Sequence, residues 1–445
     1  MKISTSKEAN PNYLAKLIYI QEEDYFPHTN ADKLKCVTVD FQNVITGLDA
    51  PAGFYVYFPV ECQIADKILS YTNSYRDSTL NKDKEATGFF ETNKRVRALR
   101  LRSLHSQGYI LPAEKVFRAF GHKVSQSDLQ GMNNDYFDYI DSDLVCNKYI
   151  IPEKTTGNPK GKNQAARLSR LVEGQVHLHV DTDNLRKEIQ RIPLDSEVTV
   201  SFKNHGTSGW SSHVLAKTPQ NLVQKALTWL KLIPEPVEYD LIYGSRKTIK
   251  NKYIKDPKGN NHFFCYDIWQ SMVEKYELKD KLPKGFSLYY EIVGFTKDKA
   301  YIQSKYDYGC NQDLGEAKIK VYRVTFTNPD GIVFDLSTLD AKAFTEKIGL
   351  EFVDVLYHGK LRDLTTHLTG VDHSDLDDRT HKELIIKEME EKWNGKNCYM
   401  CKNTVPEEGV VLRVEDNYRF EAYKLKCAIF LEQESKSLDA GEASE

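Results

Sequence analysis

The stretch 198–210, VTVSFKNHGTSGW, constrains the fold more than any other part of the sequence. Apolar and small polar residues alternate as far as Phe202, which is the two-residue period of a β-strand. The run from Gly206 to Gly209 then supplies residues that tolerate the backbone angles of tight turns. Lys203 is therefore expected where a strand ends and a turn begins. A lysine held there, partly desolvated and near other cations, can act as an amine nucleophile, although this short pattern alone more often marks an ordinary surface lysine.

Four further motifs follow in order along the chain: YGSRK at 243–247, SLYYEIVG at 287–294, EEGVVLR at 407–413 and YKLK at 423–426. Together with KNHGTSG they resemble the collinear motifs of the covalent nucleotidyltransferases, the superfamily of ATP-dependent DNA ligases, RNA ligases and mRNA capping enzymes. Within it, KNHGTSG is most similar to the RNA ligases. The run DTDNLR at 181–186 looks like the lead-in of RNA ligases that carry an N-terminal OB domain.

The resemblance implies a catalytic role for Lys203, Lys424, Lys426 and Glu291. Lys203 is expected to attack the α-phosphorus of ATP and form a lysyl–AMP adduct. The AMP then passes to a 5′-phosphate end, which a 3′-hydroxyl seals. Lys424 and Lys426 stand two apart on an expected strand, so both side chains face the same side and can reach the α-phosphate.

Two carboxylates complete the set that the resemblance implies. Glu408 matches the glutamate of the family motif and is the expected ligand of Mg²⁺ or Mn²⁺, because hard cations prefer carboxylate oxygens. Glu407 would face the other way on a strand and is assigned a lesser role. Glu291 lies in an otherwise apolar strand, where a carboxylate needs a partner. Its equivalent in relatives hydrogen-bonds the ribose, and a buried structural ion pair is the alternative.

A nucleotide-binding set also follows from the resemblance, and it comprises Phe202, Gly206, Arg246, Glu291, Tyr322, Val324, Lys424 and Lys426. Arg246 resembles the family's basic residue that contacts ribose or a phosphate. The strand VYRVTF departs from the family, because Thr325 stands where an aspartate is common. The residue that stacks on adenine therefore stays open. His205 and Ser208 also depart from the DNA-ligase pattern and favour the RNA ligases.

The region 14–112 contains short strand-like runs separated by turn residues, which is typical of a small barrel. The pieces PHTNADKL at 27–34 and KRVRALRLRSLHSQG at 94–108 resemble the OB fold of the same ligases. The second piece predicts a nucleic-acid-binding surface, for which the candidates are Arg95, Arg97, Arg100 and Arg102. An exposed strand whose charges are only solvated is the alternative.

The predicted fold class is α+β: an N-terminal OB-fold β-barrel, then a nucleotidyltransferase (adenylyltransferase) domain with mainly antiparallel sheets. The barrel with its insertions spans 1–151, and a Pro-, Gly- and Lys-containing linker spans 152–166. The nucleotidyltransferase domain spans 167–431. The acidic tail 432–445 is expected to be disordered.

The composition argues against an overall basic protein, a disulfide-stabilised protein and a structural zinc protein. The net charge of −3 shows no overall basic character, so a phosphate-binding surface must be local. The eight cysteines show no disulfide spacing, and the lone CxxC at Cys398 and Cys401 lacks the further ligands that structural zinc needs. The N-terminus lacks an apolar signal, so we expect a cytoplasmic enzyme without a membrane partner. We also expect a monomer.

The function expected is an ATP-dependent RNA ligase that uses Mg²⁺ or Mn²⁺ and acts on nicked duplexes or RNA-terminated strands. The alternatives are a capping-type guanylyltransferase, a DNA ligase or a non-catalytic nucleic-acid-binding protein. Capping enzymes and DNA ligases usually place an OB domain after the last lysine motif. Too few residues follow Lys426 to form one.

Overall fold

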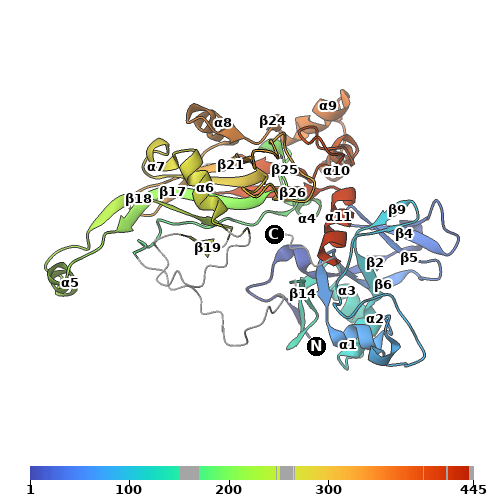
Figure 1. The fold of residues 1–445 in the computed structure, drawn as a ribbon. Coiled ribbons are helices and arrows are strands. Elements are labelled where there is room, and N and C mark those ends of the chain that lie inside the picture. Colours follow the sequence, from blue (N-terminus) through green and yellow to red (C-terminus); the bar gives the residue numbers. More distant parts are fainter. Residues whose placement is uncertain are drawn as a thin grey trace. The chain divides into compact units, whose positions relative to one another are not determined.

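The computed structural model describes residues 1–150, 170–246, 248–250, 264, 266–393, 395–416 and 419–439. The chain forms two compact units (Figure 1). Among the described residues, the first unit comprises 1–150, 183–190 and 426–439, and the second comprises 170–182 and 191–425. The linker predicted at 152–166 lies outside the described residues.

The first unit consists of short strands and short helices. Its strands are β1 (Ile3–Ser4), β2 (Ala15–Ile20), β3 (Tyr25–Pro27), β4 (Leu34–Val39), β5 (Gln42–Gly47), β6 (Gly53–Phe58), β7 (Cys62–Ile64), β8 (Leu99–Leu101), β9 (Leu104–Ser106), β10 (Tyr109–Pro112), β11 (Tyr136–Phe137), β12 (Tyr139–Ile140), β13 (Asp143–Leu144), β14 (Cys146–Lys148) and β15 (Asp183–Asn184). Its helices are α1 (Asp66–Tyr71), α2 (Ala113–Ala119), α3 (Gln126–Gly131), α4 (Leu185–Glu188) and α11 (Ala428–Asp439).

Antiparallel pairing organises this unit. One sheet has the order β10-β6-β2-β11, and another has the order β3-β4-β5. The fully buried Phe58, Phe117 and Phe137 belong to the core on one side of the first sheet, and Val37 and Val44 of the second sheet pack in a separate cluster with Ile20. The pairings among residues 1–150 form separate sheets rather than one closed ladder, so the OB-fold barrel stays a prediction.

The C-terminal segment differs from the disordered tail predicted from residue 432, because α11 continues to Asp439. Its buried residues include Leu431, Ser435 and Leu438, which recur at spacings of four and three. That spacing places them on one face of a helix, and burial of this face stabilises the segment. Residues 426–439 also group with the first unit rather than with the predicted nucleotidyltransferase domain.

The second unit contains two larger sheets. Its strands are β16 (Glu197–Phe202), β17 (Thr207–Lys217), β18 (Val237–Ser245), β19 (Thr248–Ile249), β20 (Phe286–Gly294), β21 (Ala317–Thr327), β22 (Val333–Asp335), β23 (Glu351–Phe352), β24 (Val355–Lys360), β25 (Gly409–Val414) and β26 (Glu421–Lys426), whose last residue falls in the first unit. One sheet has the order β19-β18-β17-β20-β21-β22, and in the other β26, β25, β16 and β24 lie side by side.

Helices of the second unit connect and cover these sheets. They are α5 (Leu222–Trp229), α6 (Ile268–Lys275), α7 (Leu278–Lys281), α8 (Thr338–Lys347), α9 (Leu364–Thr369) and α10 (Asp378–Trp393). Trp269 and Met272 of α6 pack into the core of the larger sheet with Leu288 and Ile292 of β20. The predicted α+β class with antiparallel sheets is confirmed. Within the described residues, every helix is too short or too polar to cross a lipid bilayer.

Candidate active site

Lys203 follows directly after a central strand, as the sequence predicted. Strand β16 pairs with β24 on one side and with β25 on the other. The β25 ladder ends with Phe202 opposite Val410, and the Lys203 backbone N–H then donates to the Gly409 carbonyl at 2.9 Å. Two neighbouring strands therefore fix the backbone of Lys203 just before the chain turns away.

The turn after Lys203 packs closely against β20. A Cβ atom on Gly206 would lie 2.6 Å from the Ile292 carbonyl oxygen and 3.1 Å from the Glu291 Cβ atom. A side chain at Gly206 would therefore force the turn and the strand apart. The same close packing brings Glu291 next to the nucleophile loop, and Glu291 itself is buried opposite Ser208 of β17.

The Lys203 ammonium group contacts a buried carboxylate. Its Nζ lies 2.8 Å from Glu408 Oε1, with the lysine side chain 24% exposed and the glutamate side chain 3% exposed. His205 Nδ1 lies 3.7 Å from the other oxygen of Glu408, and the His205 backbone N–H donates to the Tyr308 hydroxyl at 2.6 Å. The structure thus joins the predicted nucleophile to the predicted metal ligand.

Glu407 is also buried, and its own surroundings differ from those of Glu408. Burial raises the pKa of the Glu407 carboxyl above its usual value, and the negative charges of Asp354 and Glu408 add to this rise. Tyr399 lies on the same loop, donates a hydrogen bond to Asp354 and forms a tilted ring contact with Phe202. The aromatic ring next to Phe202 is therefore that of Tyr399.

Arg246 follows directly after β18, which pairs with β17, and it contacts Asp181. Its Nε donates to Asp181 Oδ1 at 3.1 Å, and its Nη2 bonds the same oxygen. His179 Nε2 lies 3.9 Å from this carboxylate oxygen, and His179 Nδ1 lies 2.6 Å from the Tyr322 hydroxyl. Arg246 and Tyr322, both predicted, are thus connected through two residues that precede the nucleophile strand.

The histidine in this cluster is held in its neutral form. Burial lowers the pKa of His179 to about 3, and the positive charges of Arg246, Lys203 and Arg323 contribute to that shift against the opposing charge of Asp181. The charges of Lys203 and Arg246 both lower the pKa of His179. His179 was not predicted from the sequence, because the run HLHVD at 177–181 matches none of the motifs found elsewhere in the chain.

Val324 and Lys424 complete the predicted residues of this unit. Val324 is fully buried in the core cluster of β20 and β21, so its role here is packing. Lys424 is half-buried on β26, next to the buried Leu425. The predicted alternation along this strand is confirmed, since Lys426 at its end is also half-buried.

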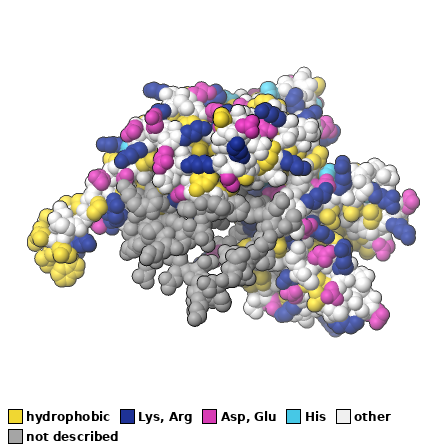
Figure 2. Space-filling view, viewed as in Figure 1, with side chains coloured by type: hydrophobic (Ala, Val, Ile, Leu, Met, Phe, Trp, Pro, Cys, Tyr) yellow, Lys and Arg dark blue, Asp and Glu magenta, His cyan; other side chains and the backbone are white. Residues whose placement is uncertain are grey.

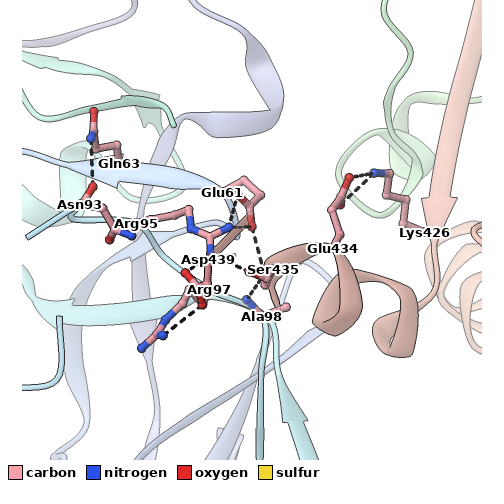
Figure 3. A network of polar contacts seen from close by, with 10 residues as sticks. All are labelled: Glu61, Gln63, Asn93, Arg95, Arg97, Ala98, Lys426, Glu434, Ser435 and Asp439. Carbon is pink, nitrogen blue, oxygen red and sulfur yellow. Dashed lines mark hydrogen bonds and ion pairs between the residues drawn. The ribbon is translucent and has the colours of Figure 1, made fainter. Parts of the chain in front are cut away.

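In the first unit, Lys426 pairs with a residue of the C-terminal helix (Figure 3). Its Nζ lies 2.8 Å and 3.0 Å from the two carboxylate oxygens of Glu434. Its carbonyl oxygen accepts a hydrogen bond from Arg186 at 3.1 Å. Helix α11 therefore contributes a carboxylate partner for one of the two motif lysines.

The arginines predicted to bind nucleic acid divide into two groups. Arg95 is 0% exposed and pairs with both oxygens of Glu61, with Asp439 and with the Ser435 carbonyl (Figure 3). Arg97 also pairs with Asp439, at 3.3 Å. The two others, Arg100 and Arg102, are exposed. The enclosure of Arg95 favours a structural role over contact with a ligand.

Metal ligands are sparse in the part of the chain that the structure describes. No group of three or more His, Cys, Asp and Glu side chains gathers there. The Cys398 and Cys401 thiols lie next to each other, and this neighbour together with burial raises the pKa of Cys398. Mg²⁺ usually takes only one or two protein carboxylates. The single buried carboxylate of Glu408 fits that donor set.

The fold of the whole chain resembles that of an RNA ligase of known structure. A Naegleria gruberi RNA ligase mutant with ATP and Mn gives a TM-score of 0.53 at 13% identity, over 95% of this chain and 99% of that chain. Another mutant of that ligase, with AMP and Mn, gives 0.52 at 14% identity, over 94% and 98%. The ligase with PPi gives 0.51 at 14% identity, over 95% and 99%. No protein-family model and no curated protein matches the sequence.

Proposed function

We propose that the protein is an ATP-dependent RNA ligase that seals 3′-hydroxyl and 5′-phosphate ends through lysyl–AMP and adenylylated 5′-phosphate intermediates. The observation that carries the proposal is the contact at 2.8 Å between Lys203 Nζ and the buried Glu408 carboxylate, at the end of a central strand. The similarity of the fold to RNA ligase structures supports the same assignment.

Lys203 is the nucleophile in this proposal. Its attack forms a bond between Nζ and the α-phosphorus of ATP and breaks the bond from that phosphorus to the pyrophosphate oxygen. The amine must be neutral when it attacks, so the ammonium proton has to leave first. Glu408 holds the ammonium group before the reaction, and a divalent cation bound there would offset negative charge on the α-phosphate.

The remaining residues are proposed to position the nucleotide. Arg246 offers a planar, permanently charged group for a phosphate or ribose, and Asp181 orients it. Glu291 is proposed to accept a hydrogen bond from the ribose, since the Gly206 turn packs directly against it. Lys424 and Lys426 are proposed to bind the α-phosphate. Tyr322 is held by His179 and is the aromatic candidate for the adenine site.

Adduct formation tests this function. The protein is first treated with pyrophosphate to remove any bound AMP, then incubated with Mg²⁺ and α-labelled ATP or GTP, and separated by denaturing electrophoresis. We expect label from ATP on the wild-type chain and none on Lys203→Ala. Label from GTP alone would instead support a capping-type guanylyltransferase. Absence of label from both would leave a nucleic-acid-binding protein.

The substrate is tested by strand joining. Nicked duplexes and single-stranded ends of RNA and of DNA are compared with pre-adenylylated protein, so that the first step is no longer limiting. We expect joining of RNA ends. Joining of all-DNA nicks at the same rate would favour a DNA ligase.

A further inference from the structure

The hairpin between β17 and β18 ends in a small helix outside the rest of the second unit. Strand β17 pairs with β20 only from Thr207 to Ser212, but it pairs with β18 as far as Lys217. Beyond Ser212, β17 continues to pair with β18, and a single bridge joins Ala216 to Leu171. Helix α5 lies at the end of this hairpin (Figure 1).

The residues of this hairpin tip, 222–233, are mostly apolar and mostly exposed. No residue of α5 is buried. Leu222 is 85% exposed and Trp229 is 81% exposed, and Val223, Leu230 and Leu232 are exposed as well. Figure 2 shows hydrophobic side chains gathered over α5, at the left of the view. An isolated exposed leucine is ordinary, but a contiguous apolar group marks an interaction surface.

The helix sorts its residues onto two faces. At 3.6 residues per turn, positions 222, 223, 226, 227, 229 and 230 share one face, and all of them are apolar. Positions 224, 225 and 228 share the other face and are polar. Asn221 and Gln224 form a capping box, and Gln220 Nε2 donates to the Thr228 hydroxyl at 3.1 Å. These bonds use the polar side chains within the helix and its first turn, while no residue of the apolar face is buried.

The charges of the hairpin tip have one sign. Lys225 and Lys231 are exposed, and the sequence from 218 to 234 contains no acidic residue. The nearest carboxylate, Glu235, pairs with Lys217 at 2.8 Å. A short amphipathic helix with Trp and Leu on one face and lysines beside it matches the boundary between lipid headgroups and acyl chains. The lysines add attraction to anionic headgroups.

The size of the hairpin tip argues against a second copy or another folded protein as the partner. A stable protein interface uses roughly 20–30 residues on each side. The tip offers a convex surface from Leu222 to Ile233, which is about half of that number. Insertion into a lipid surface needs only a few apolar side chains and a basic charge, because the bilayer adapts its shape to them.

We propose that the hairpin tip is a membrane-docking element that inserts its apolar face into the headgroup region of an anionic lipid bilayer. Trp229 and Leu222 provide the inserted side chains, and Lys225 and Lys231 contact the anionic headgroups. This proposal departs from the expectation that the protein has no membrane partner. It stands whether or not the protein is a ligase, because the tip contains none of the residues assigned to the reaction.

Vesicle sedimentation of the full chain tests the proposal. Vesicles of phosphatidylcholine are compared with vesicles that also contain phosphatidylglycerol. We expect sedimentation with the anionic vesicles, and a loss of more than about tenfold in the Leu222→Ser/Trp229→Ser variant. The control Leu314→Ser changes a leucine that is 77% exposed in another loop, and it should bind like the wild type. Lys225→Glu/Lys231→Glu should remove the preference for phosphatidylglycerol.

Two results would overturn the proposal. One is equal sedimentation of wild type and Leu222→Ser/Trp229→Ser with anionic vesicles. The other is a lack of vesicle binding together with a dimer in light scattering that the double variant abolishes, since the tip would then join two copies. Adduct formation from ATP in the wild type tests the proposed function. Because these changes are on the surface, adduct formation in each variant at the wild-type level shows that the variant folds.

Discussion

Lys203 in the second unit and Arg95 in the first are both cations paired with carboxylates, but they differ in access to solvent. Lys203 is partly exposed, whereas its partner Glu408 is buried. Arg95 is completely buried, and its guanidinium is shared between Glu61 and Asp439. A phosphate can approach the first cation without unfolding the chain. It cannot approach the second.

This difference separates a site that can exchange partners from one that cannot. The Lys203 ammonium group keeps part of its contact with water, so exchanging its carboxylate partner for a phosphate costs less than breaking a fully buried pair. A fully buried pair has lost its hydration, and breaking it leaves an uncompensated charge. We therefore expect changes at Lys203 and Glu408 to affect activity, and changes at Arg95 to affect stability.

The largest expected effect is the loss of adduct formation in Glu408→Gln. The neutral amide keeps the shape but no longer offers a carboxylate to the lysine or to a cation. The rate of lysyl–AMP formation should fall by about a thousandfold, or about 4 kcal/mol. The free energy of unfolding in urea should change less than in Arg95→Ala, because Lys203 stays partly exposed to water when its partner becomes neutral. A large loss of stability with normal single-turnover adduct formation would show that Glu408 has a structural role and no role in the reaction.

The next largest effect is the loss of stability in Arg95→Ala. Removal of the guanidinium leaves Glu61 buried without its cation, and burial already raises the pKa of this carboxyl. The free energy of unfolding should fall by about 3 kcal/mol, measured by urea titration. The control Arg100→Ala changes an exposed arginine of β8 and should change it by less than about 0.5 kcal/mol. Equal values for the two variants would show that Arg95 is not held as described.

The sequence predicted features that depend on neighbouring residues, and it did not predict contacts between residues far apart in the chain. The end of β16 at Phe202 and the alternation of Lys424, Leu425 and Lys426 could be predicted, because strand period and turn residues are local signals. The same signals correctly indicated a buried Glu291 in β20.

Arg95 could not be assigned in this way, because its partner Asp439 lies 344 residues further along the chain. Two of the acidic residues that made the tail look disordered pair with cations in the structure. Glu434 contacts Lys426, and Asp439 contacts Arg95. Composition alone counts such charges as solvated, whereas each one is neutralised by a contact that only the tertiary fold creates.

A smaller effect concerns pH and sharpens the contrast within the second unit. His179 is neutral when folded, with its pKa lowered by burial from the ordinary 6.5 to about 3. Stability from this group is full above pH 6.5 and is lost as the pH falls towards 3, because the unfolded chain binds the proton first. Between pH 7 and pH 5 the wild type should lose about 2 kcal/mol more than His179→Gln. Parallel losses in urea titrations at both pH values would contradict the burial of His179.

The smallest effect concerns the exposed arginines that follow Arg95 in the sequence. If Arg100 meets an RNA phosphate, Arg100→Ala should weaken RNA binding by about 1 kcal/mol or less, equally for different sequences. It should also reduce the slope of log affinity against log salt by about 1, since one fewer counterion is released. The control Arg118→Ala removes an exposed arginine of α2 that already pairs with Glu114, and it should leave the slope unchanged. An unchanged slope in Arg100→Ala would mean that exposure alone does not identify a phosphate contact. The sequence motif around Lys203, and not its exposure to solvent, would then be what distinguishes it from the exposed arginines.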